Sequence, residues 1–176
     1  MGILNVTPDS FYAASRIENE KNLLLTAKRM IDEGADILDI GAYSSRPGAD
    51  DMDVQEELKR LIPAISLMAK EHPDIYISAD TFRSEVADKA LYAGAHIIND
   101  ISGGMADSNM MPVVANHSGG YVLMHMRGNP QNMQEMTSYR DLKAEVEQFF
   151  TEQVEKANRT GIREIMLDPG IGFSKT

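Results

Sequence analysis

The chain of 176 residues is long enough for one globular domain with its own core, because 43% of its residues are hydrophobic. Acidic side chains outnumber basic ones by 27 to 17, and the net charge of -10 repels nucleic acid and anionic membranes, so we expect neither as a partner. The chain has no cysteine, which excludes disulfides and thiolate metal sites, and no signal-like segment at its start, so the cytoplasm is the expected location.

Short aliphatic runs recur along the chain, most of them preceded by glycine. Such runs are typical of strands that are buried on both faces of a parallel sheet. The six expected strands are "MGILNV" (1–6), "GADILDI" (34–40), "PDIYISAD" (73–80), "GAHIIND" (94–100), "GGYVLMH" (119–125) and "GIREIMLD" (161–168). The residues predicted to end them are Asn5, Asp39, Asp80, Asn99, Met124 and Asp168.

Helical patterns lie between these runs. Residues 138–160 carry apolar side chains at helical spacing, namely Leu142, Val146, Phe149, Phe150, Val154 and Ala157. Asp53 and Glu56 have capping-box spacing ahead of a second apolar pattern, in which Pro63 is expected to kink or locally interrupt the helix.

The alternation of strand and helix predicts an α/β fold with a parallel sheet. The strand ends recur about every 33 residues, as βα units do, and eight such units would need roughly 260 residues, the usual length of a (β/α)8 TIM barrel. A barrel collects ligand groups from the carboxyl ends of many strands, and nearly every expected strand ends on Asp or Asn. We therefore predict a single domain over residues 1–176, an incomplete barrel of about six βα units.

Several polar residues have a structural as well as a functional interpretation. Asp80 precedes an expected helix start, so an N-cap role and a ligand role are equally open. Asn99 and Asp100 must point to opposite faces of a strand, and Asp100 is expected to be the structural one. Arg46, in "SSRPGA", suits a phosphate, but for a single loop arginine a solvated surface side chain is the more common explanation. His125 is expected to be a packing residue, and the four histidines show no zinc spacing.

The run "DPGIGFSKT" at residues 168–176 invites comparison with a nucleotide phosphate loop. A phosphate loop requires a glycine where Ser174 stands, and a helix after the lysine. We therefore reject the nucleotide interpretation. What remains is Asp168 at a strand end, followed by a Pro-Gly turn that lets the backbone pass close to whatever Asp168 binds.

Taken together, "MGILNVTPDSF", "SSRPGA", "SADTF", "IINDISGG", "VLMHMRGNPQNMQ" and "DPGIGFSKT" resemble the dihydropteroate synthase family along the whole chain. The resemblance implies a (β/α)8 barrel of the pterin-binding type. It also implies a transferase of folate biosynthesis that condenses 6-hydroxymethyl-7,8-dihydropterin pyrophosphate with p-aminobenzoate, with the help of Mg²⁺, and that is a target of sulfonamides.

The resemblance also assigns roles. Asp80, Asn99 and Asp168 would hold the pterin, and Asp39 and Met124 complete the strand-end residues expected to bind substrate. Asn5 and Arg46 would act on the pyrophosphate, with Asn5 also the expected metal ligand. Two loops would close over the p-aminobenzoate, and the residues expected there to bind substrate are Thr7, Pro8, Phe11, Ser45 and Pro47.

Departures from the family pattern accompany the matches. "YAAS" replaces a glycine-rich stretch, Ala42, Tyr43 and Ser45 replace Gly-Glu and Thr, and Ser174 replaces a glycine. Strands seven and eight, with their Ser-Arg-Lys and Arg-x-His motifs, are expected to be missing, so the chain by itself is expected to be inactive and the full-length enzyme a homodimer. Two alternatives stay open: a noncatalytic pterin-binding module and a methyltetrahydrofolate-dependent methyltransferase.

Overall fold

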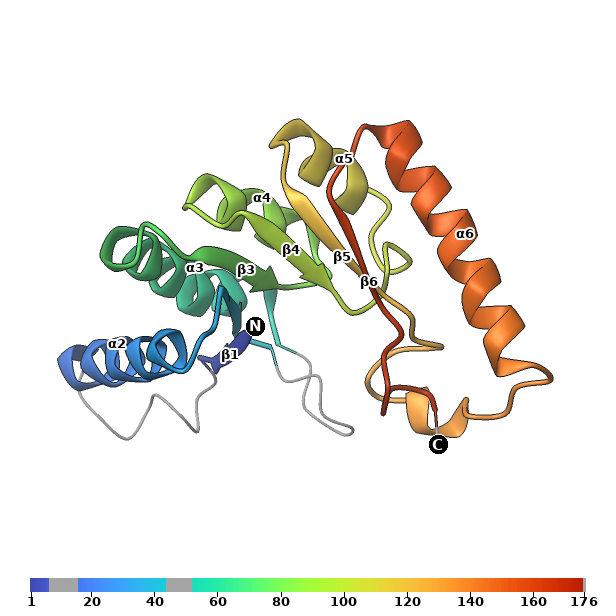
Figure 1. Ribbon diagram of the computed structural model, residues 1–176, viewed down its shortest axis with the longest axis horizontal. Helices are drawn as coiled ribbons and strands as arrows, with labels where there is room; N and C mark the ends of the chain where they lie inside the picture. The colour runs from blue at the N-terminus through green and yellow to red at the C-terminus, as the bar shows by residue number, and fades with distance from the viewer. Residues whose placement is uncertain (7–15, 44–51, 176) are drawn as a thin grey trace.

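The computed structural model describes residues 1–6, 16–43 and 52–175. Its centre is a parallel sheet in which the strands are neighbours in the order in which they occur along the chain (Figure 1). The strands are β1 (Gly2–Asn5), β2 (Ile37–Gly41), β3 (Tyr76–Asp80), β4 (Ile97–Asp100), β5 (Gly120–Met124) and β6 (Ile165–Asp168). This sequential parallel order is that of a barrel wall, and it confirms the expected repetition of βα units.

The helices follow the strands along the outer side of the arc that the sheet forms (Figure 1). They are α2 (Arg16–Asp32), α3 (Val54–Glu71), α4 (Ser84–Tyr92), α5 (Met110–Asn116) and α6 (Leu142–Thr160), with a short 3₁₀ helix η1 (Met133–Glu135) before α6. None of the helices described in 16–43 and 52–175 is long and apolar enough to cross a membrane.

Local capping explains where two of the helices begin. The Asp53 carboxylate accepts a hydrogen bond of 3.1 Å from the Gln55 amide at the start of α3, and Asp141 accepts one of 3.0 Å from the Ala144 amide at the start of α6. Gly161, with φ of 110°, ends α6 in the left-handed region that favours glycine. Pro63 lies inside α3, which continues as one helix on both sides of it, so the expected interruption is absent and the alternative, a kink, stays a prediction.

The two faces of the sheet differ in chemistry. Alternate strand residues point toward the helices and form the main core; Leu38, Ile40, Ile77, Ile98 and Leu123 are fully buried there. The other alternate positions, on the inner face of the arc, carry most of the polar residues of the strands; Asp100 is an exception. Burial of the outer face therefore stabilises the arc and leaves the inner face available for a ligand.

The strand boundaries correct two of the sequence-based predictions. Strand β2 continues past Asp39 to Gly41, and β4 includes Asp100 after Asn99. Asp39 and Asn99 therefore sit one position or more inside their strands, where their side chains are fixed by the sheet rather than by a loop.

Candidate active site

The sheet brings together the strand residues that the sequence singled out. In the register of the parallel pairs, Asn5 is opposite Gly41, Asp80 opposite Asn99, and Met124 opposite Asp168. Alternation along the strands places all of these predicted residues, with Asp39, on the inner face near the carboxyl ends. The structure thus gathers the candidate residues from all six strands at one edge, as a barrel active site requires.

Asp39 and Asn99 contact each other across the intervening strand. The Asn99 amide nitrogen donates a hydrogen bond of 3.0 Å to Asp39 Oδ2, although the two residues belong to β2 and β4. Two oxygens beside this bond, Asp39 Oδ1 and Asn99 Oδ1, are buried and have no hydrogen-bond partner among the described residues, while the Ser78 hydroxyl lies close enough to Asp39 to help lower its pKa. Because a buried unpaired polar atom is costly, this group of acceptors indicates a site whose hydrogen bonds are completed by a ligand.

Burial shifts the titration of the two inner carboxyl groups. Desolvation raises the pKa of Asp39 above its ordinary value, and the neighbouring Ser78 and Asn99 side chains oppose that shift. The pKa of Asp80 is raised well above its ordinary value, first by desolvation and then by the negative charges of Asp39, Glu57 and Asp100. A carboxyl group that keeps its proton more readily can donate as well as accept hydrogen bonds.

The structure excludes one of the two roles left open for Asp80. Helix α4 begins after Arg83, and the Ser84 amide donates a hydrogen bond of 2.8 Å to Asp107 Oδ2. The Asp107 carboxylate therefore occupies the capping role at this helix start. The N-cap interpretation of Asp80 is wrong, and its carboxyl group is left for the inner face of the sheet.

Asp100 is structural, as expected. Its carboxylate accepts hydrogen bonds from the Ser102 amide and hydroxyl, at 2.8 and 2.6 Å, from the Gly104 amide at 2.9 Å, and from the Tyr121 hydroxyl at 2.5 Å. Asp100 is fully buried on the helix side of the sheet. These bonds hold the loop after β4 rather than a substrate.

The loop after β6 orients the Asp168 carboxylate. The Gly170 amide donates a hydrogen bond of 2.8 Å to Asp168 Oδ1. Gly170 has φ of 63°, and a Cβ there would lie 2.3 Å from the His125 carbonyl oxygen, so only glycine fits. Lys175 Nζ donates to the carbonyl oxygens of His125, Gly170 and Phe173 at 2.9, 3.2 and 3.0 Å.

The structural role of Lys175 was missed by sequence reasoning, which considered this lysine only as part of a phosphate loop. Desolvation lowers its pKa, while the nearby Asp168 charge opposes that shift. Ser174 has φ of 49°, in the left-handed region, and its hydroxyl accepts a 2.9 Å hydrogen bond from the Arg127 amide. The loop thus keeps the glycine-like backbone and gains a side-chain contact.

Apolar side chains lie next to the polar residues at the strand ends. Ile101, Met124, Met126 and Met133 form a small buried cluster, with Phe82 and Phe173 packed against it. A flat heteroaromatic ligand matches these surroundings, because its edge can hydrogen-bond to the carboxyl and amide groups while its faces contact methionine and aromatic side chains. Met124 ends β5, as predicted. It belongs to this apolar cluster and is also opposite the polar Asp168 in the sheet.

His125 packs against α6, as predicted. It is 4% exposed, and its ring meets the Phe149 ring edge-on with a centroid separation of 4.9 Å. Its Nδ1 is buried with no hydrogen-bond partner in the described part of the chain. Burial, together with the charges of Lys175 and Arg127, lowers the pKa of His125 to about 4.

Asn5 ends β1 and is exposed, so its amide oxygen is accessible to a cation or a phosphate. Within 1–6, 16–43 and 52–175, no group of three or more His, Asp or Glu side chains could hold a metal ion. The remaining predicted site residues lie outside the described residues; they are Thr7, Pro8, Phe11, Ser45, Arg46 and Pro47.

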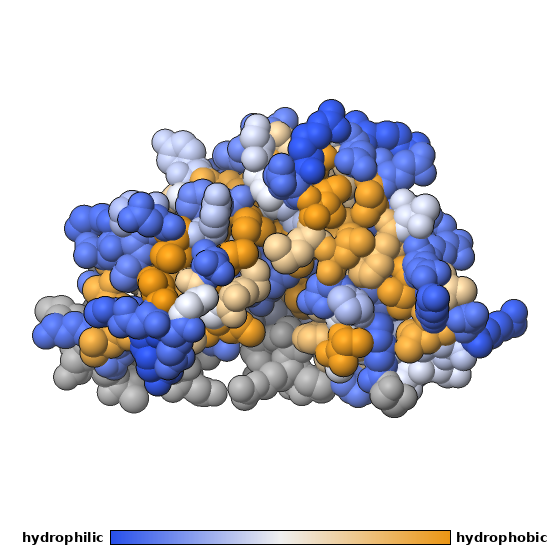
Figure 2. All heavy atoms as spheres, in the orientation of Figure 1, coloured by the Kyte–Doolittle hydropathy of each residue, from blue (hydrophilic) through white to orange (hydrophobic). Residues whose placement is uncertain are grey.

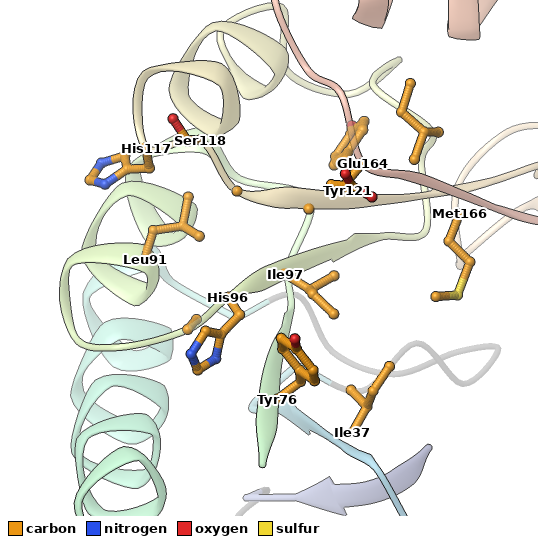
Figure 3. Close-up of a pocket in the computed structure, with 14 residues that line it drawn as sticks. Ile37, Tyr76, Leu91, His96, Ile97, His117, Ser118, Tyr121, Glu164 and Met166 are labelled. Atoms are coloured by element: carbon orange, nitrogen blue, oxygen red, sulfur yellow. The ribbon is translucent and has the colours of Figure 1, made fainter. Parts of the chain in front are cut away.

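A separate cavity of about 580 Å³ lies at the opposite, amino-terminal ends of the strands. Figure 3 shows Ile37, Tyr76 and Ile97 side by side along it. Both histidines there have protein partners: His96 Nδ1 accepts a 3.1 Å hydrogen bond from the Ile77 amide, and His117 pairs with Asp88. This cavity contains none of the predicted site residues.

Comparison with known proteins identifies the family. A family model described as "Pterin binding enzyme" matches residues 1–176, the whole of the chain. The chain belongs to the pterin-binding enzyme family. Its polar inner edge, with the unpaired acceptors around Asp39 and Asn99, is therefore the candidate pterin site.

Individual members of the pterin-binding enzyme family extend this match. A dihydropteroate synthase of Synechocystis is 49% identical over all of this chain. In crystal structures, a Yersinia pestis dihydropteroate synthase in a sulfonamide drug complex superposes with a TM-score of 0.90 at 40% identity, and a Xanthomonas albilineans enzyme with 4-aminobenzoic acid does so with 0.86 at 39%. The expected fold, an incomplete (β/α)8 barrel of the pterin-binding type, is confirmed, with six strands and one α-helix between each consecutive pair in the described part of the chain.

The chain spans about three fifths of the length of these relatives. It covers 61% of the Synechocystis protein, and 64% and 62% of the Yersinia and Xanthomonas chains, while every part of this chain is matched.

Proposed function

We propose that the protein to which this chain belongs is a dihydropteroate synthase, a transferase of folate biosynthesis built as one (β/α)8 domain. It condenses 6-hydroxymethyl-7,8-dihydropterin pyrophosphate with p-aminobenzoate to give 7,8-dihydropteroate and pyrophosphate. The observation that carries the proposal is the pair of buried, unpaired acceptors at Asp39 and Asn99, in a chain that matches dihydropteroate synthases over its whole length.

The pterin edge supplies what this site lacks. A pterin carries adjacent N–H donors on its pyrimidine edge, and Asp168, held by the Gly170 amide, can accept two of them. Asn99 offers both donor and acceptor, and the raised pKa of Asp80 allows its carboxyl group to donate to a ring nitrogen. These three residues would orient the pterin so that its exocyclic carbon faces the open mouth of the arc.

The reaction breaks the bond between that carbon and the pyrophosphate oxygen and forms a bond to the p-aminobenzoate nitrogen, which then loses a proton. The electron-rich pterin stabilises the positive charge on the carbon, so no protein nucleophile is required. The protein's part is to position both substrates and to stabilise the departing negative charge, for which Arg46 and Asn5 are the candidates.

Mg²⁺ fits this arrangement as a partner of the substrate. Magnesium sites typically use few protein oxygens together with substrate phosphates, so the exposed amide oxygen of Asn5 and the substrate diphosphate would suffice to hold the ion. When bound, Mg²⁺ would neutralise charge on the leaving pyrophosphate.

Assembly, location and inhibition belong to the same proposal. The full-length protein would act as a homodimer in the cytoplasm, where a chain without cysteine needs no oxidising environment. The Yersinia pestis enzyme was crystallised in a sulfonamide drug complex. We propose that sulfonamides compete with p-aminobenzoate here too.

The test uses the full-length gene product and measures pterin pyrophosphate binding and pyrophosphate release. Asp168→Asn should weaken pterin binding by about 10- to 100-fold, because a hydrogen bond to a charged group contributes about 1.5–3 kcal/mol. Asp88→Asn, the same change at a surface ion pair, is the matched control. Binding without pyrophosphate release would instead indicate a noncatalytic pterin-binding module, and unchanged affinity in Asp168→Asn would contradict the site assignment.

A further inference from the structure

Lys175, in the loop after β6, uses its ammonium group on three carbonyl oxygens. Nζ donates hydrogen bonds of 3.2 and 3.0 Å to the carbonyl oxygens of Gly170 and Phe173, in the same loop, and one of 2.9 Å to that of His125, which follows β5. An ammonium group has three N–H donors, so all of them are engaged with the backbone. One side chain therefore joins the loop after β6 to the end of the neighbouring strand.

The turn that Lys175 holds is the one that orients Asp168. The Gly170 amide donates the hydrogen bond of 2.8 Å to Asp168 Oδ1. The carbonyl oxygen of Gly170 accepts hydrogen bonds from Lys175 Nζ and, at 3.0 Å, from the Phe173 amide. Gly170 thus connects the two charged side chains, because its carbonyl group binds the lysine and its amide binds the carboxylate. A shift of this residue would change both bonds together.

The turn also lies very close to the end of β5. A Cβ at residue 170 would be 2.3 Å from the His125 carbonyl oxygen and 3.2 Å from Met124 Cγ. Carbonyl oxygens that converge on one point repel one another unless a cation lies between them. The Lys175 ammonium group supplies that cation, so it stabilises the close approach of the Gly170 turn to β5.

The charge of Lys175 also acts on the Asp168 carboxylate. Burial lowers the pKa of Lys175, and the negative charge of Asp168 opposes that shift. The interaction of two charges is mutual, so the ammonium group in turn stabilises the negative charge on Asp168. A charged carboxylate is the stronger acceptor for the N–H donors of a pterin. Orientation and charge therefore favour the same role for Lys175.

We propose that Lys175 is a positioning residue for pterin binding, which fixes the Gly170 turn against the end of β5 and thereby directs the Asp168 carboxylate at the two N–H donors of the pterin edge. This inference rests on the proposed function, in which Asp168 binds the pterin. Lys175 acts through Asp168 rather than on the substrate, because its three donors are engaged with carbonyl oxygens.

The variant that tests this is Lys175→Met in the full-length gene product. Methionine is unbranched like lysine but supplies neither a charge nor an N–H donor. Calorimetry would compare 6-hydroxymethyl-7,8-dihydropterin pyrophosphate with its 2-deamino analogue, which keeps the ring N–H but lacks the amino donor. We expect the Kd to rise about tenfold for the first and about threefold for the analogue, because the analogue can form only one of the two hydrogen bonds to Asp168.

Lys175→Arg keeps the test decisive if Lys175→Met does not fold, since arginine retains the positive charge. A planar guanidinium cannot direct three donors at carbonyl oxygens that converge on one point, so we expect the Kd for the pterin pyrophosphate to rise about threefold, and less for the analogue. Lys70→Met is the matched control. It removes the same charge from an exposed side chain of α3, which pairs with Glu71 at 3.3 Å, and should leave both affinities unchanged.

A double variant with Asp168→Asn separates this inference from the proposed function. If Lys175 acts through Asp168, adding Lys175→Met to Asp168→Asn should raise the Kd for the pterin pyrophosphate by less than about twofold. Three results would overturn the inference while leaving the proposed function intact: no loss of affinity in the Lys175 variants, equal losses for the two ligands, or the full loss on top of Asp168→Asn. Failure of the unmutated protein to bind the pterin pyrophosphate would overturn both.

Discussion

Gly41 leaves room for the Asp80 carboxyl group on the inner face of the sheet. A Cβ at residue 41 would lie 3.1 Å from Asp80 Oδ2 and 3.3 Å from Asp80 Cβ, closer than side chains normally pack. In Gly41→Ala the Asp80 carboxyl group must move by a few tenths of an ångström. We expect the Kd for the pterin to rise about tenfold, a loss of about 1.4 kcal/mol of binding free energy, which a calorimetric titration would measure.

Gly120→Ala provides the comparison for that result. It is also a strand glycine on the inner face, and a Cβ there would meet Ile97 Cγ1 at 3.3 Å, at the end of the sheet away from Asp80. Pterin affinity should change little in this variant. If the two alanine variants lost affinity equally, the effect would come from general strain in the sheet and not from Asp80.

At the scale of single residues, residue type and the two-residue period of strands were enough to predict which polar side chains lie close together. Asn99 and Asp100 separate to opposite faces, and Asp80 and Asn99 are neighbours in the sheet, because parallel strands align their carboxyl ends. The sequence could not reveal that Lys175 binds three carbonyl oxygens, because that contact depends on how one loop folds back over another.

Among the elements, α6 creates an apolar environment for a titratable side chain. Its Phe149 and Phe150 rings lie 4.9 and 6.5 Å from the His125 ring, which is buried and whose pKa is lowered to about 4. In the unfolded chain the histidine titrates near pH 6.5. The unfolded state therefore binds a proton between about pH 6.5 and 4 that the folded state does not, and stability falls as the pH is lowered through this window.

The variant His125→Phe should remove that part of the pH dependence. Relative to the variant, the unmutated protein should lose up to about 3 kcal/mol of unfolding free energy between pH 7 and pH 4. Denaturant unfolding at several pH values measures the difference. The buried carboxyl groups of Asp39, Asp80 and Asp100 have raised pKa values and favour folding at low pH, but they are common to both proteins and cancel.

His117→Phe, which removes an exposed histidine at the end of α5, is the control for this measurement. An unaltered pH profile in His125→Phe, or the same alteration in both variants, would contradict the assignment to His125.

The helices themselves show where element-level prediction succeeds. The apolar spacing of 138–160 predicted α6, and the structure places it at Leu142–Thr160, bounded by Asp141 and Gly161 as caps. The interruption that was one of two expectations for Pro63 does not occur, and α3 continues past it. The contact between Glu57 and Arg83 joins residues from separate elements, and nothing in the spacing of either pattern indicates it.

At the scale of the whole molecule, the repeated βα units made the fold predictable. In the described sheet, however, the first and last strands each pair with a neighbour on one side only. Strands β1 and β6 are its outer members, and both expose large apolar side chains: Ile3 is 62% exposed, and Met166 and Leu167 are each 48% exposed. In the space-filling view, apolar side chains gather near the middle, over the region of β5 and β6 (Figure 2). An unpaired strand with apolar side chains is a template for pairing with another chain.

A polypeptide of these 176 residues alone should therefore associate in a concentration-dependent way, and Leu167→Lys should weaken that association. A lysine on an edge strand would have to be desolvated when a second strand pairs, so we expect association to require about tenfold higher concentration. Ile171→Lys, at a more exposed position in the loop after β6, adds the same charge without changing the strand. Sedimentation velocity would distinguish the cases: a monomer at all concentrations, or equal effects of both lysines, would show that the open edge does not drive association.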